Sequence, residues 1–325
     1  MKKVLLATTA LVAFAGVASA DVNLSGSARF GLKYVEQPAL SPFSSTSLEK
    51  RMTINIDVST ETDSGLELGG RVRIRSDENK YQAGDAGPFA KPTTPAGLDA
   101  SFTGLSGANV YVKAGGFKLT VGNIDGALES MPGLYNGSVG LDGNGWSNLT
   151  TNTAAKGYFK WDSFSSRGNG NNGAIINYAV GDFAAALSFA SFNDASSSVT
   201  NPDVIAAHLA YTFGDWTVAL GIQDGDTVAV LDKTVLTVSG KLGDFGVGLA
   251  YADNDGINKF TINGSYTIGA TTIKAYVSDE NSVAATDNPY GLGVEYDLGG
   301  ATLVGAYSQN ETGTAYATAG IKFKF

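Results

Sequence analysis

The chain has 325 residues, no cysteine and one histidine, and its formal net charge is −9. Glycine accounts for 42 residues, nearly twice the usual ~7%, whereas proline accounts for only 8. The 43% hydrophobic content argues against disorder, and the missing cysteines exclude disulfides and thiol nucleophiles. The acidic balance argues against a nucleic-acid-binding protein.

The first twenty residues have the pattern of a secretory signal peptide. Lys2 and Lys3 precede an apolar stretch over residues 4–15, and Ala18-Ser19-Ala20 forms a small-residue cleavage motif before Asp21. We therefore predict that residues 1–20 are removed and that the protein leaves the cytoplasm. No later apolar run is long enough for a membrane-spanning helix.

From residue 21 onward the dominant period is two, which is typical of β-strands. The first three segments alternate apolar with polar residues over 22–34, 51–58 and 66–75, and the last over 320–325. Gly-containing turns such as Gly181-Asp182 and Gly214-Asp215 suit tight hairpins. Longer polar connections are expected at roughly 36–49, 76–107, 123–172, 193–202, 224–232, 253–257, 279–287 and 309–313. This division predicts sixteen strands in a single all-β domain, residues 21–325.

Charged residues in these strands all share the polar phase, so the opposite face is apolar. A soluble β-sandwich would show the same local alternation, but sixteen strands would leave edges that need protection. A closed barrel has no edges, and closure is obligatory in a bilayer. The pattern favours a transmembrane antiparallel β-barrel whose apolar phase faces lipid, and a soluble lectin-like protein is the less favoured reading.

Aromatic residues support the membrane interpretation. Tyrosines such as Tyr34, Tyr211 and Tyr296 lie near strand ends in the apolar phase, as in the interfacial girdles of membrane barrels. The chain ends in Phe325, with Phe323 at the alternate position. This ending is similar to the C-terminal signal by which outer-membrane barrels are recognised for assembly.

Several stretches together resemble the general-diffusion porins of the Rhodobacter type. They are DVNLSGSARFGLKY, TDSGLELGG, AYTFGDWTVALG, IGATTIKAY, GLGVEYDLGGATLVG and the terminal GIKFKF, and they span the barrel from end to end. The resemblance implies a homotrimer of sixteen-stranded barrels in the Gram-negative outer membrane, in contact with lipid and lipopolysaccharide. Each barrel would be a water-filled channel for small hydrophilic solutes and ions, narrowed by a long third loop folded into the lumen.

The third connection, 123–172, is the candidate constriction, since its length exceeds that of ordinary loops. Its apolar residues suit packing against an inner wall. Its acids face, by phase, a set of basic residues on the first three strands, and opposed charges of this kind screen solutes. Alternatively, individual arginines neutralise wall carboxylates such as Asp57 and Glu67. The candidate constriction residues are Arg29, Lys33, Arg51, Arg71, Arg73, Arg75, Asp125, Glu129, Asp142 and Asp162.

One position departs from the family pattern. Its members often carry an acid directly after the glycine that ends the fifth strand, where this chain has Asn123. Acids are also sparse in the loop. We therefore expect a pore less cation-selective than its relatives and no cofactor, although the resemblance leaves room for calcium.

Two other functions are compatible with a barrel of this kind. An outer-membrane enzyme would need a catalytic centre, but the single histidine, His208, falls on the lumen phase without a nucleophile motif, so we predict a wall residue and no enzyme. A substrate-specific channel would line its lumen with aromatics, and Tyr276 and Tyr316 are the main ones there. Passive diffusion is therefore preferred, with a substrate-specific channel as the alternative.

Overall fold

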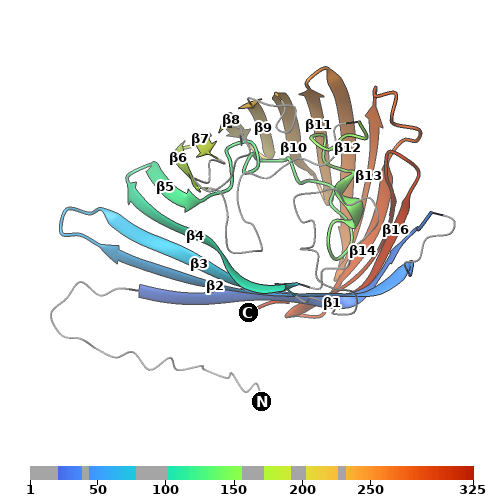
Figure 1. The fold of residues 1–325 in the computed structure, drawn as a ribbon, viewed down its shortest axis with the longest axis horizontal. Coiled ribbons are helices and arrows are strands. Elements are labelled where there is room, and N and C mark those ends of the chain that lie inside the picture. The colour runs from blue at the N-terminus through green and yellow to red at the C-terminus, as the bar shows by residue number, and fades with distance from the viewer. Residues whose placement is uncertain (1–20, 39–43, 78–101, 156–171, 192–202, 226–231) are drawn as a thin grey trace, which may run out of the picture.

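The computed structural model describes residues 21–38, 44–77, 102–155, 172–191, 203–225 and 232–325. Within them, sixteen strands form one closed barrel in which each strand pairs antiparallel with its neighbours in sequence and β16 pairs with β1 (Figure 1). The predicted fold class is therefore confirmed. The strands are β1 (Asp21–Val35), β2 (Thr46–Glu61), β3 (Glu67–Asp77), β4 (Phe102–Ala114), β5 (Phe117–Asn123), β6 (Asn172–Val180), β7 (Phe183–Ser191), β8 (Asp203–Phe213), β9 (Trp216–Gly225), β10 (Lys233–Leu242), β11 (Phe245–Asn254), β12 (Ile257–Ile268), β13 (Thr271–Glu280), β14 (Tyr290–Asp297), β15 (Ala301–Gln309) and β16 (Ala315–Lys324).

Helical structure in the described residues is confined to one short 3₁₀ turn, Asn144–Trp146, in the connection between β5 and β6. None of the helical structure described is long and apolar enough to cross a membrane. The predicted signal peptide, residues 1–20, lies outside the described residues.

The alternation in the sequence separates the two faces of the barrel. On β1 and β8 the apolar phase is outward, where Phe30 is 53% and Leu209 54% exposed. The opposite phase of β8 is buried inside the barrel, as Ala206 and His208 show. A charge on the outward face would cost about 2–4 kcal/mol at the bilayer midplane, which explains why most strand charges keep to the inner phase. The predicted separation is not complete, because Lys50 of β2 and Asp279 of β13 lie on the outward phase, opposite Phe30 and Phe260.

Two strands begin earlier than the sequence predicts. The expected connections 36–49 and 76–107 are shorter, because β2 starts at Thr46 and β4 at Phe102. The reason on β2 is that alternation continues upstream of Arg51. Leu48 lies outward opposite Leu32, and the buried Glu49 lies inward.

Tight hairpins at one end of the barrel depend on glycine. Gly181 and Gly214 begin their turns with φ of 53° and 56°, a conformation that glycine adopts without steric cost. These turns are compatible with the right-handed twist of the flanking strands, so a hairpin of two residues suffices there.

The last residue helps to close the barrel. The Phe325 backbone NH donates to the Gly26 carbonyl at 3.0 Å, and the Gly26 NH donates to the Phe325 carbonyl at 2.7 Å. The Phe325 ring covers Gly26, where any side chain would collide with it, and lies 6.1 Å from the Phe323 ring. The pairing of β1 with β16 thus extends to the terminal residue.

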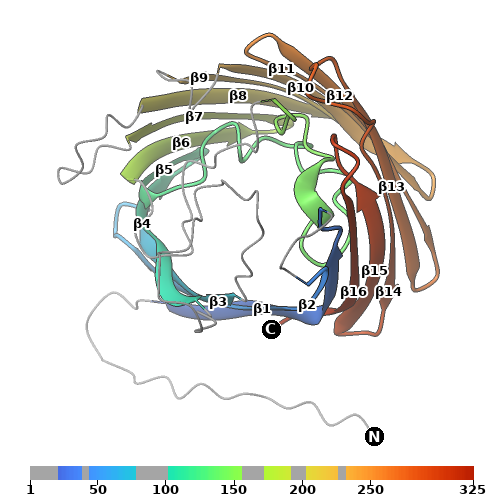
Figure 2. The same ribbon diagram turned by 45° about the vertical axis from the view of Figure 1, so that its right-hand side comes forward.

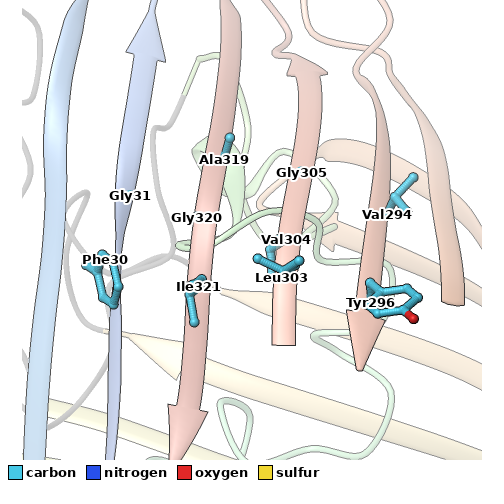
Figure 3. Close-up of a pocket in the computed structure, with 10 residues that line it drawn as sticks. All are labelled: Phe30, Gly31, Val294, Tyr296, Leu303, Val304, Gly305, Ala319, Gly320 and Ile321. Carbon is cyan, nitrogen blue, oxygen red and sulfur yellow. The ribbon is translucent and has the colours of Figure 1, made fainter. Parts of the chain in front are cut away.

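A shallow apolar groove of about 600 Å³ lies on the outer face across β1 and β14–β16 (Figure 3). Small residues, Gly305 and Ala319, line it between the larger side chains of Phe30, Leu303 and Tyr296. Its lining is hydrocarbon, which matches a surface that faces the bilayer.

Candidate functional site

The connection between β5 and β6 leaves the wall after Asn123, and its described part, up to Ala155, lies inside the barrel (Figure 2). Its apolar side chains pack on small inward residues of the wall. Burying them removes apolar area from water, and this is the main force that holds a loop against a wall. The cluster comprises Ile124, Ala127, Leu128, Met131, Leu134 and Leu149 of the loop with Ile175, Ala186, Ala206, Ala210, Ala219, Val235 and Ala252 of the wall.

Hydrogen bonds fix the middle of the loop to β15 and β16. Ser308 Oγ donates to the Asn144 carbonyl at 2.8 Å, and the Leu141 NH donates to Thr318 Oγ1 at 3.1 Å. Gly140 adopts a φ of 81°, and a Cβ there would lie 2.5 Å from Thr318 Oγ1. A glycine is therefore required where the loop approaches the wall.

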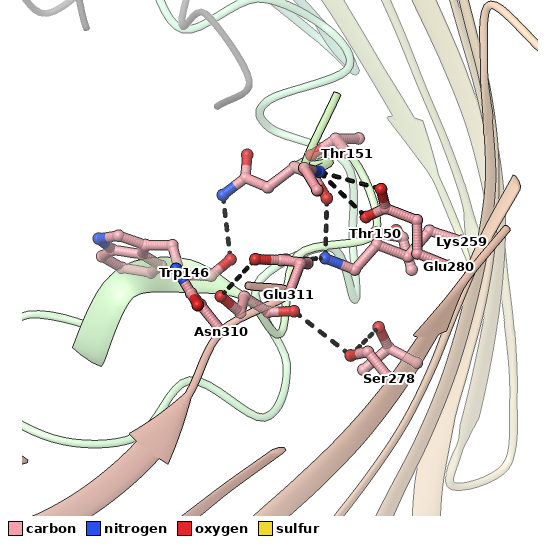
Figure 4. Close-up of polar contacts among 12 residues, drawn as sticks. Trp146, Thr150, Thr151, Lys259, Ser278, Glu280, Asn310 and Glu311 are labelled. Carbon is pink, nitrogen blue, oxygen red and sulfur yellow. Dashed lines mark hydrogen bonds and ion pairs between the residues drawn. The ribbon is translucent and has the colours of Figure 1, made fainter. Parts of the chain in front are cut away.

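A buried polar network holds the far part of the described loop (Figure 4). Lys259 of β12, whose side chain is 0% exposed, forms an ion pair with Glu311 from the β15–β16 connection. The Lys259 ammonium also donates to the Asn152 carbonyl at 2.7 Å, and Ser147 Oγ donates to Glu311 at 3.1 Å. Partners of this kind offset the large cost of burying a charge.

Neighbouring strands extend this network. Lys233 of β10 donates to Asn254 Oδ1 at 2.9 Å and to the Thr151 carbonyl at 3.3 Å. The Ala154 NH donates to the Glu280 carboxylate at 2.9 Å. Loop backbone groups that would otherwise lie buried without water are thus paired with wall side chains.

Basic residues line the opposite part of the wall, on β16 and β1–β3. Arg29 lies directly across from Arg51 on β2 and from Lys322 on β16. Its Nε donates to Glu49 at 2.7 Å. Two of the three cations in this row bind wall carboxylates, Arg29 to Glu49 and Lys322 to Glu295. The cations of the row still outnumber these carboxylates, which gives this wall a positive potential.

Lys33 connects this wall to the loop. Its ammonium lies 2.5 Å from Asp142 Oδ2, and Asp142 also accepts the Asn144 NH at 3.1 Å. Burial alone would raise the pKa of the Asp142 carboxyl, but Lys33 and Arg29 outweigh it and hold that pKa below its ordinary value. Asp142 is therefore ionised at neutral pH, as the predicted anionic side of a constriction requires.

The remaining sequence-predicted residues are less uniform in their surroundings. Arg71 uses its Nε to bind Asp57 at 2.5 Å, so it neutralises a wall carboxylate, the alternative considered from the sequence. Arg73 is buried, and Arg51 and Arg75 are half-buried. On the loop, Asp125 is exposed and Glu129 half-buried, whereas Asp162 lies outside the described residues.

The constriction residues predicted from the sequence leave out several inward charges. Lys322 lies beside Arg29 and, with Lys274, binds Glu295 at 2.7 and 2.9 Å. Their phase placed them in the lumen, but only the register of the closing strands brings Lys322 next to Arg29. The Lys259–Glu311 pair joins residues 52 positions apart and had no sequence signal beyond phase.

Asn123, where relatives often carry an acid, has a structural role. Its Oδ1 accepts the Ala108 NH at 3.2 Å, and its carbonyl accepts Asn109 Nδ2 at 3.1 Å. In the part of the chain that the structure describes, no group of three His, Cys, Asp or Glu side chains is placed to hold a metal ion.

Comparison with known proteins agrees with this architecture. Residues 7–315 match the Gram-negative porin family. The chain belongs to this family. A porin from Fuscovulum blasticum is 29% identical and one from Rhodobacter capsulatus 27% identical, each match covering 94% of this chain and all of the relative. Solved structures of Rhodopseudomonas blastica porin mutants align with a TM-score of 0.75 at 26% identity, again over 94% of this chain and all of theirs.

Membership of the family and the closed barrel establish what this porin does. It is a Gram-negative outer-membrane channel through which small hydrophilic solutes and ions diffuse passively. Its relatives are channels rather than enzymes.

Proposed function

We propose that the space between the loop 123–172 and the basic wall is the selective constriction of this porin. The observation that carries the proposal is the opposition of the two sides. The apolar cluster of the loop covers the inner face of β6–β11, and its polar part is bonded to β12, β15 and β16. The basic residues Arg29, Lys33, Arg51 and Lys322 lie on β16 and β1–β2, and the loop carboxylate Asp142 meets them at Lys33. A polar passage with cations on one wall and carboxylates on the other screens solutes by charge and polarity.

The same opposition supports a pore less cation-selective than its relatives. Arg29, Arg51 and Lys322 share one row of the wall, and Asn123 replaces an acid with a neutral side chain that is engaged by the backbone of Ala108. The wall therefore attracts anions more than the sparse loop acids attract cations. Arg71, Arg73 and Arg75 extend this basic set along β3.

General diffusion is favoured over a substrate-specific channel by the lumen aromatics. Tyr276 is 2% exposed and lies beside the loop at Gly137, and Tyr316 lies beside Gly145. Both rings are therefore engaged with the loop, and neither forms part of an aromatic track along which a sugar could slide.

Assembly and export complete the proposal. The family resemblance supports a homotrimer embedded among outer-membrane lipid and lipopolysaccharide, and the motif before Asp21 supports export through a signal peptide over residues 1–20. The outward apolar phase and its aromatic residues are the surface that lipid and neighbouring copies would contact.

Single-channel recording tests this function directly. The purified protein in a planar bilayer should give large ohmic steps, arriving in threes if three pores insert together. A variant lacking most of 124–172 should give larger steps, because the loop would no longer narrow the lumen. A folded barrel that stays silent, or a deletion that leaves conductance unchanged, would contradict the proposal.

A further inference from the structure

The first part of the loop is held at one residue by two wall side chains. His208 Nδ1 lies 2.5 Å from the Ala127 carbonyl oxygen. Because a carbonyl only accepts, Nδ1 carries the hydrogen and donates it. On the adjacent strand, Ser188 Oγ accepts the Ala127 NH at 2.8 Å. Both polar backbone groups of one loop residue are thus bound by neighbouring strands, β7 and β8.

This contact lies in an apolar, water-free setting. Ala127 is fully buried, His208 is 6% and Ser188 2% exposed, and the surrounding loop and wall side chains belong to the apolar cluster. Ser188 also donates to the Ala206 carbonyl at 3.5 Å. The Ala127 carbonyl also accepts the Ser130 hydroxyl at 3.3 Å, but that bond lies within the loop and does not attach it to the wall. The bonds to His208 and Ser188 are therefore the ones that tie Ala127 to β8 and β7, and losing either weakens the wall-bound position of the loop.

The position of Ala127 matters because of its neighbours. Asp125 and Glu129, two of the four loop acids among the candidate constriction residues, lie two residues to either side of it. The Ser130 NH donates to the Gly126 carbonyl in the same turn, at 2.9 Å. Fixing Ala127 against the wall therefore also fixes the rotation of this turn, and with it the orientation of both carboxylates.

We propose that His208 and Ser188 are positioning residues of the constriction, which hold Ala127 on the wall and thereby set the bore of the pore and the placement of Asp125 and Glu129. The inference rests on the proposed function, since it assumes that the loop narrows the channel. It gives the only histidine of the chain a role that needs no catalysis.

The test compares His208→Leu with His208→Asn in single-channel recordings. Leucine removes the donor and keeps an apolar side chain, whereas the asparagine amide places an NH close to the position of Nδ1. The Ala127 carbonyl keeps its bond to Ser130 within the loop, so the leucine variant loses the net contribution of one hydrogen bond. The population with the loop off the wall should rise about 2- to 13-fold, seen as added current noise and new conductance levels. The asparagine variant should restore the wild-type record.

Two further variants keep the test decisive. Ser188→Ala removes the acceptor of the Ala127 NH together with the longer bond to the Ala206 carbonyl. It should resemble His208→Leu and replaces it as the test if the leucine variant does not assemble. Thr212→Val is the matched control, because Thr212 lies on β8 with His208 but bonds Thr217 at 3.0 Å instead of the loop. It should leave the record unchanged.

The outcomes separate the inference from the function on which it rests. If the loop deletion enlarges the pore but His208→Leu and Ser188→Ala only lower thermal stability, with unaltered current and ion selectivity, the two residues are structural and the inference is overturned. If the deletion itself leaves conductance unchanged, the proposed constriction fails first.

Discussion

The ammonium of Lys259 and the carboxylate of Glu311 form an ion pair inside the barrel, where the lysine side chain is completely buried. The pair joins β12 to the β15–β16 connection, and through Asn152 and Ser147 it also holds the loop. A charge this deep is tolerated only because each remaining polar atom has a partner.

Replacing one member of this pair should be costly. We expect Lys259→Met to destabilise the folded barrel by about 3–5 kcal/mol, because it leaves Glu311 buried without its counter-ion. The double variant Lys259→Met with Glu311→Gln should recover most of that loss. Thermal unfolding in detergent measures both, and a double variant less stable than the single one would contradict the account.

Lys274→Met supplies the control for that experiment. Lys274 is also an inward lysine bound to a carboxylate, but it is partly exposed and shares Glu295 with Lys322. Its loss should cost about 1 kcal/mol or less.

Asp142 should remain charged in mildly acidic solution. Its pKa is held below the ordinary value of 3.8, so its pairing with Lys33 contributes stability that is present above that value and is lost as the pH falls through the lowered pKa. The ion selectivity of the wild type should therefore differ from that of Asp142→Asn at pH 5, and the two should converge only below pH 3.8. The deciding measurement is at pH 3.8, where an aspartate with the ordinary pKa is half protonated. A difference between wild type and Asp142→Asn that has already fallen to half there would show that the pKa is not lowered.

Neutralising Arg71, Arg73 and Arg75 together, each to Gln, should shift ion selectivity toward cations. Three positive charges leave the wall, and Asp57 loses the guanidinium that binds it at 2.5 Å. The reversal potential in a salt gradient measures the shift. The corresponding triple lysine variant retains the charge and should stay near wild type, whereas an unchanged potential in the glutamine variant would remove these arginines from the selective set.

The terminal phenylalanine should matter more for assembly than for the stability of the finished barrel. Phe325→Ala keeps the two backbone bonds with Gly26 but loses the ring. It should lower the yield of assembled outer-membrane protein while the melting temperature of the assembled fraction changes little. Deleting the residue removes the bonds as well and should lower both quantities. An unaltered yield for Phe325→Ala would mean that the ring is not an assembly signal.

The sequence predicted those structural features that depend on residues close together in the chain. Period two and the phase of residues such as Arg29 and Lys33 predicted strands, faces and a barrel, because side-chain direction follows directly from position along a strand. Even the loop, from its apolar content, could be predicted to lie on an inner wall. The early starts of β2 and β4 were missed, since the ends of alternation merge into polar connections.

Partners across the barrel could not be predicted in the same way. Lys322 lies beside Arg29 only because of the register between the first and last strands, and Lys259 reaches Glu311 only once the connections fold inward. His208 had a single sequence signal, its inward phase, which did not reveal its contact with Ala127. Such pairings depend on the stagger of the strands around the barrel and on the course of the loops through the lumen. Neither can be read from a short stretch of sequence.

Because the loop packs on the inner face of β6–β11, membrane anchoring and narrowing of the lumen are carried out by different parts of the chain. The circumference of sixteen strands anchors the protein in the bilayer, while the described part of the loop withholds one side of the interior from water. In the proposed constriction, permeating solutes would pass beside the cationic strands. Substitutions in this one connection can consequently change the size and charge selectivity of the pore, while the number of strands and the lipid-facing surface stay the same.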